Sequence, residues 1–184
     1  MKNLVVKTCV KKSWKILCKE PLLLMGAALL GAFITAITFG ILGMVIYTGL
    51  AAMVIKLEKG PKPGVKDIFQ YMNKVLFLLV LAIIMGVSVM IGIALLVVPG
   101  LIIAALWMYA PLAMAFDDMD IVESLKYSAA MVNANGLLEH IVIVLIISVV
   151  NMLGAQLAGI GFLVTFPLTS GFVGLMYNAL KGSK

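Results

Sequence analysis

The densest group of side chains able to do chemistry lies in the segment AFDDMDIVES, residues 115–124. It holds Asp117, Asp118, Asp120 and Glu123, half of the eight acidic residues in the chain. Carboxylates this close together can bind a divalent cation or transfer protons. They can equally begin a helix, because Asp120 precedes an apolar run and Glu123 follows three residues later, as in a capping box. We favour the helix cap and keep metal binding or catalysis as the alternative.

A metal site would need more ligands than these four carboxylates. Glu139 and His140 are the nearest extra candidates, and we expect His140, the only histidine, to be structural or interfacial. Cys9 and Cys18 lie in a segment that we place in the cytoplasm, where thiols stay reduced. Walker, nucleophile-elbow and zinc-binding patterns do not occur. We therefore expect no catalytic residue, no metal and no cofactor.

The composition is that of an integral membrane protein. Of the 184 residues 64% are hydrophobic and 12% are charged, and the mean hydropathy is +1.18. Soluble domains carry about 25% charged residues. All fourteen basic residues are lysine, which disfavours bidentate recognition of phosphate by arginine, and we expect no nucleic-acid binding.

Three uncharged stretches are each too long for one membrane crossing of about 20 residues and about right for two. They are 22–55, 75–116 and 141–180. Each contains a turn signal rich in glycine or proline near its middle. These signals are FGILG at 39–43, VVPG at 97–100 and GAQLAGIG at 154–161. The sequence therefore predicts an all-α protein of six transmembrane helices, arranged as three hairpins.

The positions of the charged residues support six spans. With that number, all lysines and all acids fall on one side, and the three opposite turns carry no charge. By the positive-inside rule this side is the cytoplasm, so both termini are expected there. The resulting plan is a single membrane domain, 1–184. Its predicted parts are a basic interfacial helix (1–20), hairpin 1 (21–57), a cytoplasmic loop with a short amphipathic helix (58–74), hairpin 2 (75–116), a cytoplasmic-side helix (117–136) and hairpin 3 (137–184).

The N-terminal segment has the pattern of a helix that lies on an anionic membrane surface. At 100° per residue its apolar face holds Val6, Cys9, Val10, Ser13, Trp14, Ile16 and Leu17. Its opposite face holds Lys7, Lys11, Lys12, Lys15 and Lys19. The alternative is a helix for targeting or for docking a partner protein.

Similar amphipathic patterns precede the other two hairpins. One face of 65–74 holds Val65, Ile68, Phe69 and Met72, and one face of 121–136 holds Ile121, Leu125, Ser128 and Val132. Corresponding apolar residues recur at a near-constant spacing. We therefore predict a parallel three-fold internal repeat of surface helix plus hairpin.

The predicted spans contain polar residues and prolines but no ionisable side chain, which disfavours an ion-coupled pump. Pro111 and Pro167 each remove a backbone hydrogen bond and are expected to kink their helices. Asn151 places an amide deep in a span. The plain interpretation is helix packing. In the alternative these three residues line a cavity.

The order of features in VVPGLIIAALWMYAPLAMAFDDMDIVESLKYSAAMVNANG, followed by GIGFLVTFPLTSGFVGLMY, resembles an uncharacterised group of prokaryotic membrane proteins. The group includes the membrane domain fused to some glycerophosphoryl diester phosphodiesterases. The matching positions are Pro99, Gly100, Asp118 or Asp120, Ser128, Gly136, Gly161 and Pro167. The resemblance implies six spans in a prokaryotic cytoplasmic membrane. It brings no settled activity, and we do not expect the phosphodiesterase role to transfer, because this chain lacks that domain.

The leading expectation is a non-enzymatic inner-membrane protein that interacts with lipids, organises the membrane or binds a partner. Its expected partners are anionic lipids, a second copy of the chain or another membrane protein. One rival is a transporter or channel for a small neutral or amphipathic solute. Another is a lipid head-group enzyme that uses the acidic residues at 117–123.

Overall fold

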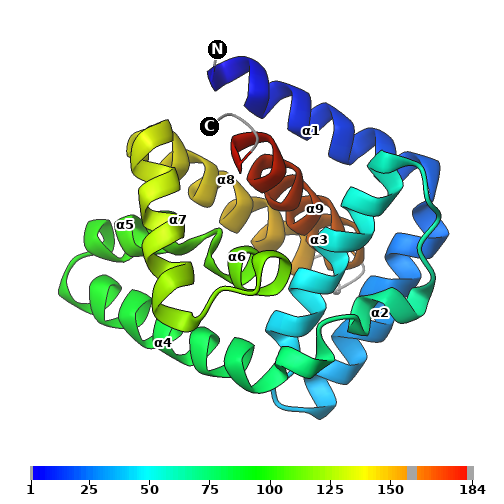
Figure 1. The fold of residues 1–184 in the computed structure, drawn as a ribbon, viewed down its shortest axis with the longest axis horizontal. Helices are drawn as coiled ribbons and strands as arrows, with labels where there is room; N and C mark the ends of the chain where they lie inside the picture. Colours follow the sequence, from blue (N-terminus) through cyan, green and yellow to red (C-terminus); the bar gives the residue numbers. More distant parts are fainter. Residues whose placement is uncertain (1, 157–160, 182–184) are drawn as a thin grey trace. The chain divides into compact units, whose positions relative to one another are not determined.

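The structure is a computed structural model that describes residues 2–156 and 161–181 (Figure 1). Helical structure covers 88% of the chain, and no strand occurs in these two ranges, so the all-α prediction is confirmed. The helices are α1 (Lys2–Lys19), α2 (Pro21–Ile37), α3 (Gly43–Lys59), α4 (Val75–Leu95), α5 (Val97–Trp107), α6 (Ala110–Asp117), α7 (Ile121–Asn135), α8 (Leu137–Gln156) and α9 (Phe162–Lys181). Two short 3-10 turns, η1 (Val65–Phe69) and η2 (Met72–Lys74), lead into α4.

The chain packs as two compact units rather than as one continuous core. Unit 1 consists of Met1–Val75 with Val150–Lys184, and unit 2 consists of Leu76–Val149. Helices α1, α2, α3 and α9 belong to unit 1, and helices α5, α6 and α7 belong to unit 2. The single membrane domain expected from the sequence stays a prediction.

Several helices are long and apolar enough to cross a membrane, which indicates a multi-pass membrane protein. The described residues contain four such helices, or five if α1 and α2, which meet at 94°, form one broken span. Helices α2 and α3 have 17 residues each. At 1.5 Å per residue they are about 26 Å long, a little shorter than the hydrocarbon core of about 30 Å. Of the six predicted spans, these two helices are therefore the ones whose length fits the hydrocarbon core least well.

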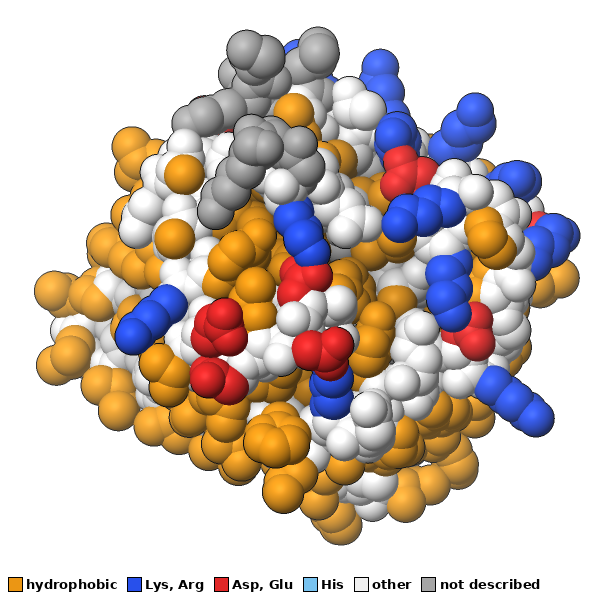
Figure 2. Space-filling view, in the orientation of Figure 1, with side chains coloured by type: hydrophobic (Ala, Val, Ile, Leu, Met, Phe, Trp, Pro, Cys, Tyr) orange, Lys and Arg blue, Asp and Glu red, His pale blue; other side chains and the backbone are white. Residues whose placement is uncertain are grey.

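Helices α4 and α8 expose more apolar side chains than a protein surrounded by water usually does. Their sequences have mean hydropathies of 2.9 and 2.2, yet only 17% of each span is buried inside the protein. Soluble monomers rarely expose contiguous apolar patches beyond a few hundred Å². Lipid hydrocarbon around these side chains removes the free-energy cost of exposing them to water. The exposed residues on α4 include Leu76, Phe77, Ile83, Val87, Met90 and Ile91, and apolar surface is prominent in Figure 2.

The first two hairpins reverse close to the predicted positions. FGILG forms the turn between α2 and α3, where Phe39 and Gly40 have positive φ angles of 49° and 86°. In the second hairpin the chain reverses at the extended Leu96, one residue before VVPG. Pro99 lies inside the first turn of α5, where its missing N–H would have had no helical partner. The third predicted turn falls largely on 157–160, outside the described residues.

Glycine allows the two arms of the second hairpin to approach closely. A Cβ atom on Gly92 would lie 2.7 Å from Gly100 Cα, and a Cβ atom on Gly100 would lie 2.8 Å from the Ile93 nitrogen. Both distances are shorter than a van der Waals contact. Gly100 in VVPG is therefore required by helix packing and not only by the turn.

Helix α3 forms the centre of unit 1, where it packs mainly against α9. Small residues bring the two helices together. A Cβ atom on Gly171 would lie 2.7 Å from Val54 Cγ2, and one on Gly174 would lie 3.1 Å from Ala51 Cβ. In lipid, where burial of apolar surface gives no driving force between helices, such close packing is the main source of association.

The predicted amphipathic helix at 65–74 is wrong as an α-helix. The segment forms η1 and η2, and Ile68 is fully buried instead of lying on a membrane surface. The Ile68 backbone lies directly against Gly49 of α3, and its Cδ1 approaches Gly31 of α2. Packing between α2 and α3 has thus overridden the helical periodicity. The three-fold repeat is not confirmed, because the segment before the second hairpin forms two 3-10 turns, whereas α1 and α7, before the other two hairpins, are α-helices.

In unit 2, Pro111 coincides with a break between α5 and α6. Pro111 lies in the first turn of α6, and the break lies at Met108 and Tyr109. Ser128 of α7 repairs the break: its Oγ donates to the Leu106 carbonyl oxygen (2.6 Å) and accepts from the Tyr109 N–H (3.1 Å). The predicted interruption of this span at Pro111 is confirmed, and a buried serine satisfies the backbone groups that it frees.

Candidate functional site

The basic face of α1 is exposed, but its apolar face is docked on protein. Lys7, Lys11, Lys12 and Lys15 are all exposed. Four of the seven residues on the predicted apolar face are buried, and the structure places α1 against α9, α3 and α2. These four residues are Cys9, Ser13, Ile16 and Leu17. The prediction that α1 lies on a membrane surface stays a prediction, but most of its apolar face packs on α9, α3 and α2.

Two large apolar residues of α1 remain available to a membrane. Val10 is 49% exposed and Trp14 is 54% exposed. Tryptophan favours the membrane–water interface because it combines an apolar body with a polar N–H group. Ser13, on the docked side, donates from Oγ to the Leu168 carbonyl oxygen of α9 (2.8 Å), which fixes α1 on α9.

The direction of α1 follows from its junction with α2. The two helices meet at 94°, with Glu20 between them and Pro21 in the first turn of α2 (Figure 1). A proline at this position cannot continue the preceding helix without loss of a hydrogen bond, but its φ angle suits the start of a new one. If α2 runs along the membrane normal, α1 lies in the membrane plane.

Charged residues from distant parts of the sequence gather at one end of unit 1. Lys12 pairs with Glu58 (2.5 Å), Lys62 pairs with Glu20 (2.6 Å) and Lys56 pairs with Asp67 (3.0 Å). These ion pairs join α1, the start of α2, the end of α3 and the loop that follows it. The α2–α3 turn at the other end of these helices has no charged residue. The one-sided distribution of charge expected from the sequence is therefore reproduced by the packing of unit 1.

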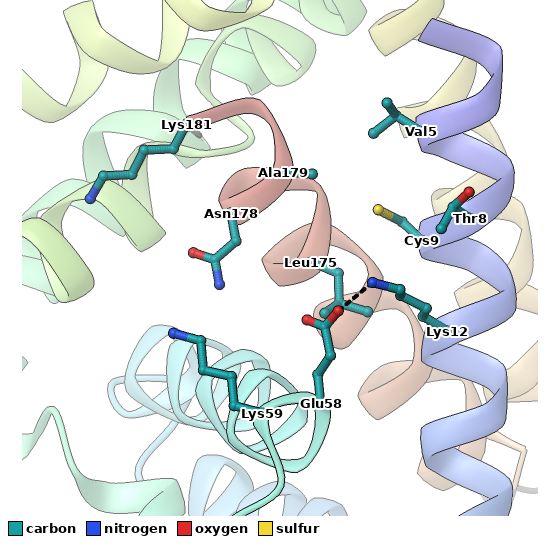
Figure 3. Close-up of a pocket in the computed structure, with 10 residues that line it drawn as sticks. All are labelled: Val5, Thr8, Cys9, Lys12, Glu58, Lys59, Leu175, Asn178, Ala179 and Lys181. Carbon is teal, nitrogen blue, oxygen red and sulfur yellow. Dashed lines mark hydrogen bonds and ion pairs between the residues drawn. The ribbon is translucent and has the colours of Figure 1, made fainter. Parts of the chain in front are cut away.

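A pocket of about 760 Å³ opens at this charged end, between α1 and the last turns of α3 and α9 (Figure 3). Its volume lies within the usual range of ligand sites, about 300–1,000 Å³. Its lining comprises Val5, Thr8, Cys9, Lys12, Glu58, Lys59, Leu175, Asn178, Ala179 and Lys181. Figure 3 shows Lys12 turned toward Glu58, while Lys59 and Asn178 point toward one another.

The electrostatics of the pocket are dominated by lysine. Three lysines and one glutamate give its lining two net positive charges. Lys59 and Lys181 also lie in the last turns of α3 and α9, where the C-terminal ends of the helix dipoles contribute about half a negative charge each. The dipoles thus offset about one of the two charges, and the pocket remains positive.

Two titrating groups of the pocket are shifted. The hydrogen bond that Lys12 donates to the Glu58 carboxylate raises the pKa of Lys12, so Lys12 keeps its charge. Burial raises the pKa of the Cys9 thiol and outweighs the opposing effect of Lys12. Cys9 is only 4% exposed and Cys18 is exposed, and neither is in a disulfide. Cys9 is therefore an apolar part of the wall and a poor nucleophile.

The acidic segment at 115–124 contains the predicted helix cap. Asp120 is the N-cap of α7, and its side chain accepts a hydrogen bond from the Glu123 N–H (2.8 Å). Asp118 has the left-handed conformation (φ 55°) that ends α6. In the described part of the chain, no three His, Cys, Asp or Glu side chains are placed to share a metal ion.

His140 lies apart from these carboxylates, buried near the start of α8. Its Nδ1 is 2.7 Å from the Gly136 carbonyl oxygen, which accepts a hydrogen bond from it. Its ring packs edge-on against Tyr109, with 5.7 Å between the ring centroids. Both contacts fit the structural role expected from the sequence.

The candidate cavity residues have packing partners. Asn151 of α8 donates from Nδ2 to Thr169 Oγ1 (3.1 Å), and Thr169 donates to the Thr165 carbonyl oxygen of its own helix (2.9 Å). Pro167 is buried inside α9. Pro111 belongs to unit 2, whereas Asn151 and Pro167 belong to unit 1.

No family model, no curated protein and no solved structure matches this chain. The resemblance to the prokaryotic six-span group therefore stays a prediction.

Sequence reasoning missed most of the pocket. It singled out Lys12 for its place on the basic face, but not Glu58, Lys59 or Asn178. Lys12 and Glu58 are 46 positions apart, and no local pattern pairs them. The available signal was the series of lysines at the ends of the predicted spans, which indicates the side of the membrane but not a pocket.

Proposed function

We propose that this protein is a non-enzymatic, six-span protein of the prokaryotic cytoplasmic membrane that binds anionic lipid through α1. Both termini lie in the cytoplasm. The protein organises lipid or anchors a partner at that surface. One observation carries the proposal: α1 docks one side on α9 and keeps its lysines exposed, on a helix at 94° to α2.

The physical argument is electrostatic. A lysine near an anionic leaflet contributes about 1 kcal/mol, and several on one helix face add to a useful affinity. Moving the lysine-rich face into hydrocarbon would cost much free energy, so this face stays in water. Val10 and Trp14 can enter the membrane–water interface. The apolar surfaces of α4 and α8 then face lipid, a second copy of the chain or a membrane partner.

The non-enzymatic part of the proposal is supported by the ordinary roles found for the residues that the rival functions would use. Asp120 caps α7, and Asn151 joins α8 to Thr169. Each of these roles follows from folding alone, as the leading interpretation of the sequence expects.

The test uses the whole protein in nanodiscs with equal amounts of phosphatidylglycerol and phosphatidylcholine. Native mass spectrometry of the released protein counts the lipids that remain bound. We expect wild type to retain phosphatidylglycerol preferentially, and less of it as salt is raised, because salt screens exposed charges. Changing Lys7, Lys11 and Lys15 together to Gln should remove most of this preference.

A matched triple variant separates the face of α1 from net charge. The control variant removes the same charge outside α1, by changing Lys66, Lys74 and Lys126 to Gln. It should keep most of the preference for phosphatidylglycerol. Equal retention of the two lipids by wild type, or equal losses in the two triple variants, would contradict the proposal.

A further inference from the structure

Beside the exposed face of α1, the pocket at the ends of α3 and α9 has features that a general affinity for anionic surfaces does not require. It is concave, it has about 760 Å³ of volume, and Val5, Leu175 and Ala179 give part of its wall an apolar character. Positive charge next to apolar wall suits a ligand that carries both an anionic group and carbon atoms.

We propose that this pocket binds one phosphate ester, with the phosphate held between Lys59, Lys12 and the Asn178 amide. The inference rests on the proposed function in one respect, since an anionic lipid head group is the expected source of the ester. Lysine binds phosphate as a point charge, and an amide adds a directed donor. The apolar part of the wall, formed by Val5, Leu175 and Ala179, favours an ester with a glycerol or similar group over an inorganic phosphate ion alone.

Lys59 is the residue on which the site depends most. It has no ion pair or hydrogen-bond partner among the residues that the structure describes. Lys59 is exposed, and Figure 3 shows its ammonium group on the same side of the pocket as the Asn178 amide. A lysine that only offset the helix dipole would not need an amide group beside its ammonium group.

Glu58 is the group that opposes binding. It holds Lys12 at 2.5 Å, and its own charge repels an anion. A bound phosphate would compete with Glu58 for the Lys12 ammonium group. Loss of the glutamate charge should therefore improve binding, an effect opposite in sign to loss of a lysine.

The experiment measures binding to the whole protein in phosphatidylcholine nanodiscs. One arm titrates phosphatidylglycerol and counts bound copies by native mass spectrometry, and the other titrates glycerol phosphate by calorimetry. We expect Lys59→Gln to weaken binding of one copy about fivefold, the value of one lysine beside an anionic group. Glu58→Gln should tighten it several-fold.

Lys66→Gln is the matched control, because Lys66 is an exposed lysine of unit 1 outside the pocket. Its effect should be less than twofold. Saturation by phosphatidylglycerol alone assigns a lipid head group, and saturation by glycerol phosphate assigns a soluble ester; both support the site.

The pocket is excluded as a phosphate site if neither ligand saturates, if Lys59→Gln and Lys66→Gln weaken binding equally, or if Glu58→Gln weakens it. The proposed function would survive these results, because it depends on the exposed lysines Lys7, Lys11 and Lys15 and on their own test. Equal retention of the two lipids by wild type in that test, together with a saturable pocket, would contradict the proposed function and leave the pocket proposal standing.

Discussion

Ser128 shows how one side chain can satisfy a broken backbone. Its hydroxyl bonds both Leu106 O and Tyr109 N at the interruption that Pro111 causes between α5 and α6. Ser128 and Tyr109 are both fully buried, so water does not readily replace the hydroxyl at this break. The cost of deleting the hydroxyl is then the cost of leaving two polar groups unpaired.

We predict that Ser128→Ala lowers the free energy of unfolding by about 1–3 kcal/mol. Ser124→Ala is the control: Ser124 is equally buried, but its hydroxyl bonds only Ile121 O within its own helix. Loss of the Ser124 hydroxyl should lower the free energy of unfolding clearly less. Thermal unfolding in detergent measures both variants, and equal shifts would show that Ser128 does not support the break.

Asp120 gives a second prediction at this scale. Asn caps a helix as well as Asp, so Asp120→Asn should be nearly silent, whereas Asp120→Ala should cost about 1 kcal/mol. Unfolding of α7 followed by hydrogen exchange measures the difference. Stabilisation of wild type by divalent cations, absent in both variants, would instead favour a metal site at 117–123.

At the scale of elements, close approach at glycine decides how the segments pack. Gly49 of α3 lies against the backbone of Ile68, where a Cβ atom would overlap the Ile68 carbonyl group. Backbone cannot move aside as a flexible side chain can. The sequence predicted an amphipathic helix at 65–74 because the periodicity of Val65, Ile68, Phe69 and Met72 is genuine, but it did not reveal the groove that Gly49 provides.

We predict that Gly49→Ala destabilises unit 1 by about 1–3 kcal/mol, as overpacking does. Gly26→Ala in α2 is the matched control, because nothing lies within 4 Å of the added Cβ atom. It should be neutral or stabilising by up to about 1 kcal/mol, the advantage of Ala over Gly in a helix. The measurement is thermal unfolding of the purified protein, and destabilisation by both variants alike would refute the contact.

The docking of α1 can be followed through its two native cysteines. Cys9 is buried against unit 1 and its pKa is raised, whereas Cys18 on the same helix is exposed. A thiol reagent at pH 8 should modify Cys18 rapidly and Cys9 slowly, as peptide mass spectrometry would show. Equal rates would mean that α1 is not docked.

The raised pKa of Cys9 also has a consequence for stability. As pH rises through 9.0, the usual value for the thiol, the unfolded chain loses this proton before the folded one does. The unfolded state is therefore stabilised relative to the folded state, and the free energy of unfolding falls as pH rises. Cys9→Ala should lose this part of the decline above pH 9 in thermal unfolding, and an unchanged pH profile would argue against it.

At the scale of the whole molecule, the sequence predicted the features that depend on local composition. The uncharged stretches predicted helices that end within a few residues of the observed ends, and the spacing of Asp120 and Glu123 predicted the cap of α7. Features that join distant residues were not predictable. The pairing of Lys12 with Glu58 depends on how α1 packs beside the end of α3, and the docked side of α1 depends on how α9 returns to α1.

The central claim is that all charged ends of the helices lie on the cytoplasmic side of a six-span protein. Labelling by an impermeant thiol reagent in intact cells tests it on a Cys9→Ala, Cys18→Ser background. Single cysteines are placed at Ile41, in the α2–α3 turn, at Leu96, in the α4–α5 turn, and at Lys62. Ile41 is preferable to Gly40, whose φ of 86° disfavours a side chain.

We predict that Ile41→Cys and Leu96→Cys are labelled from outside and that Lys62→Cys is labelled only after the membrane is opened. Labelling of Lys62→Cys in intact cells, or protection of either turn, would contradict the account.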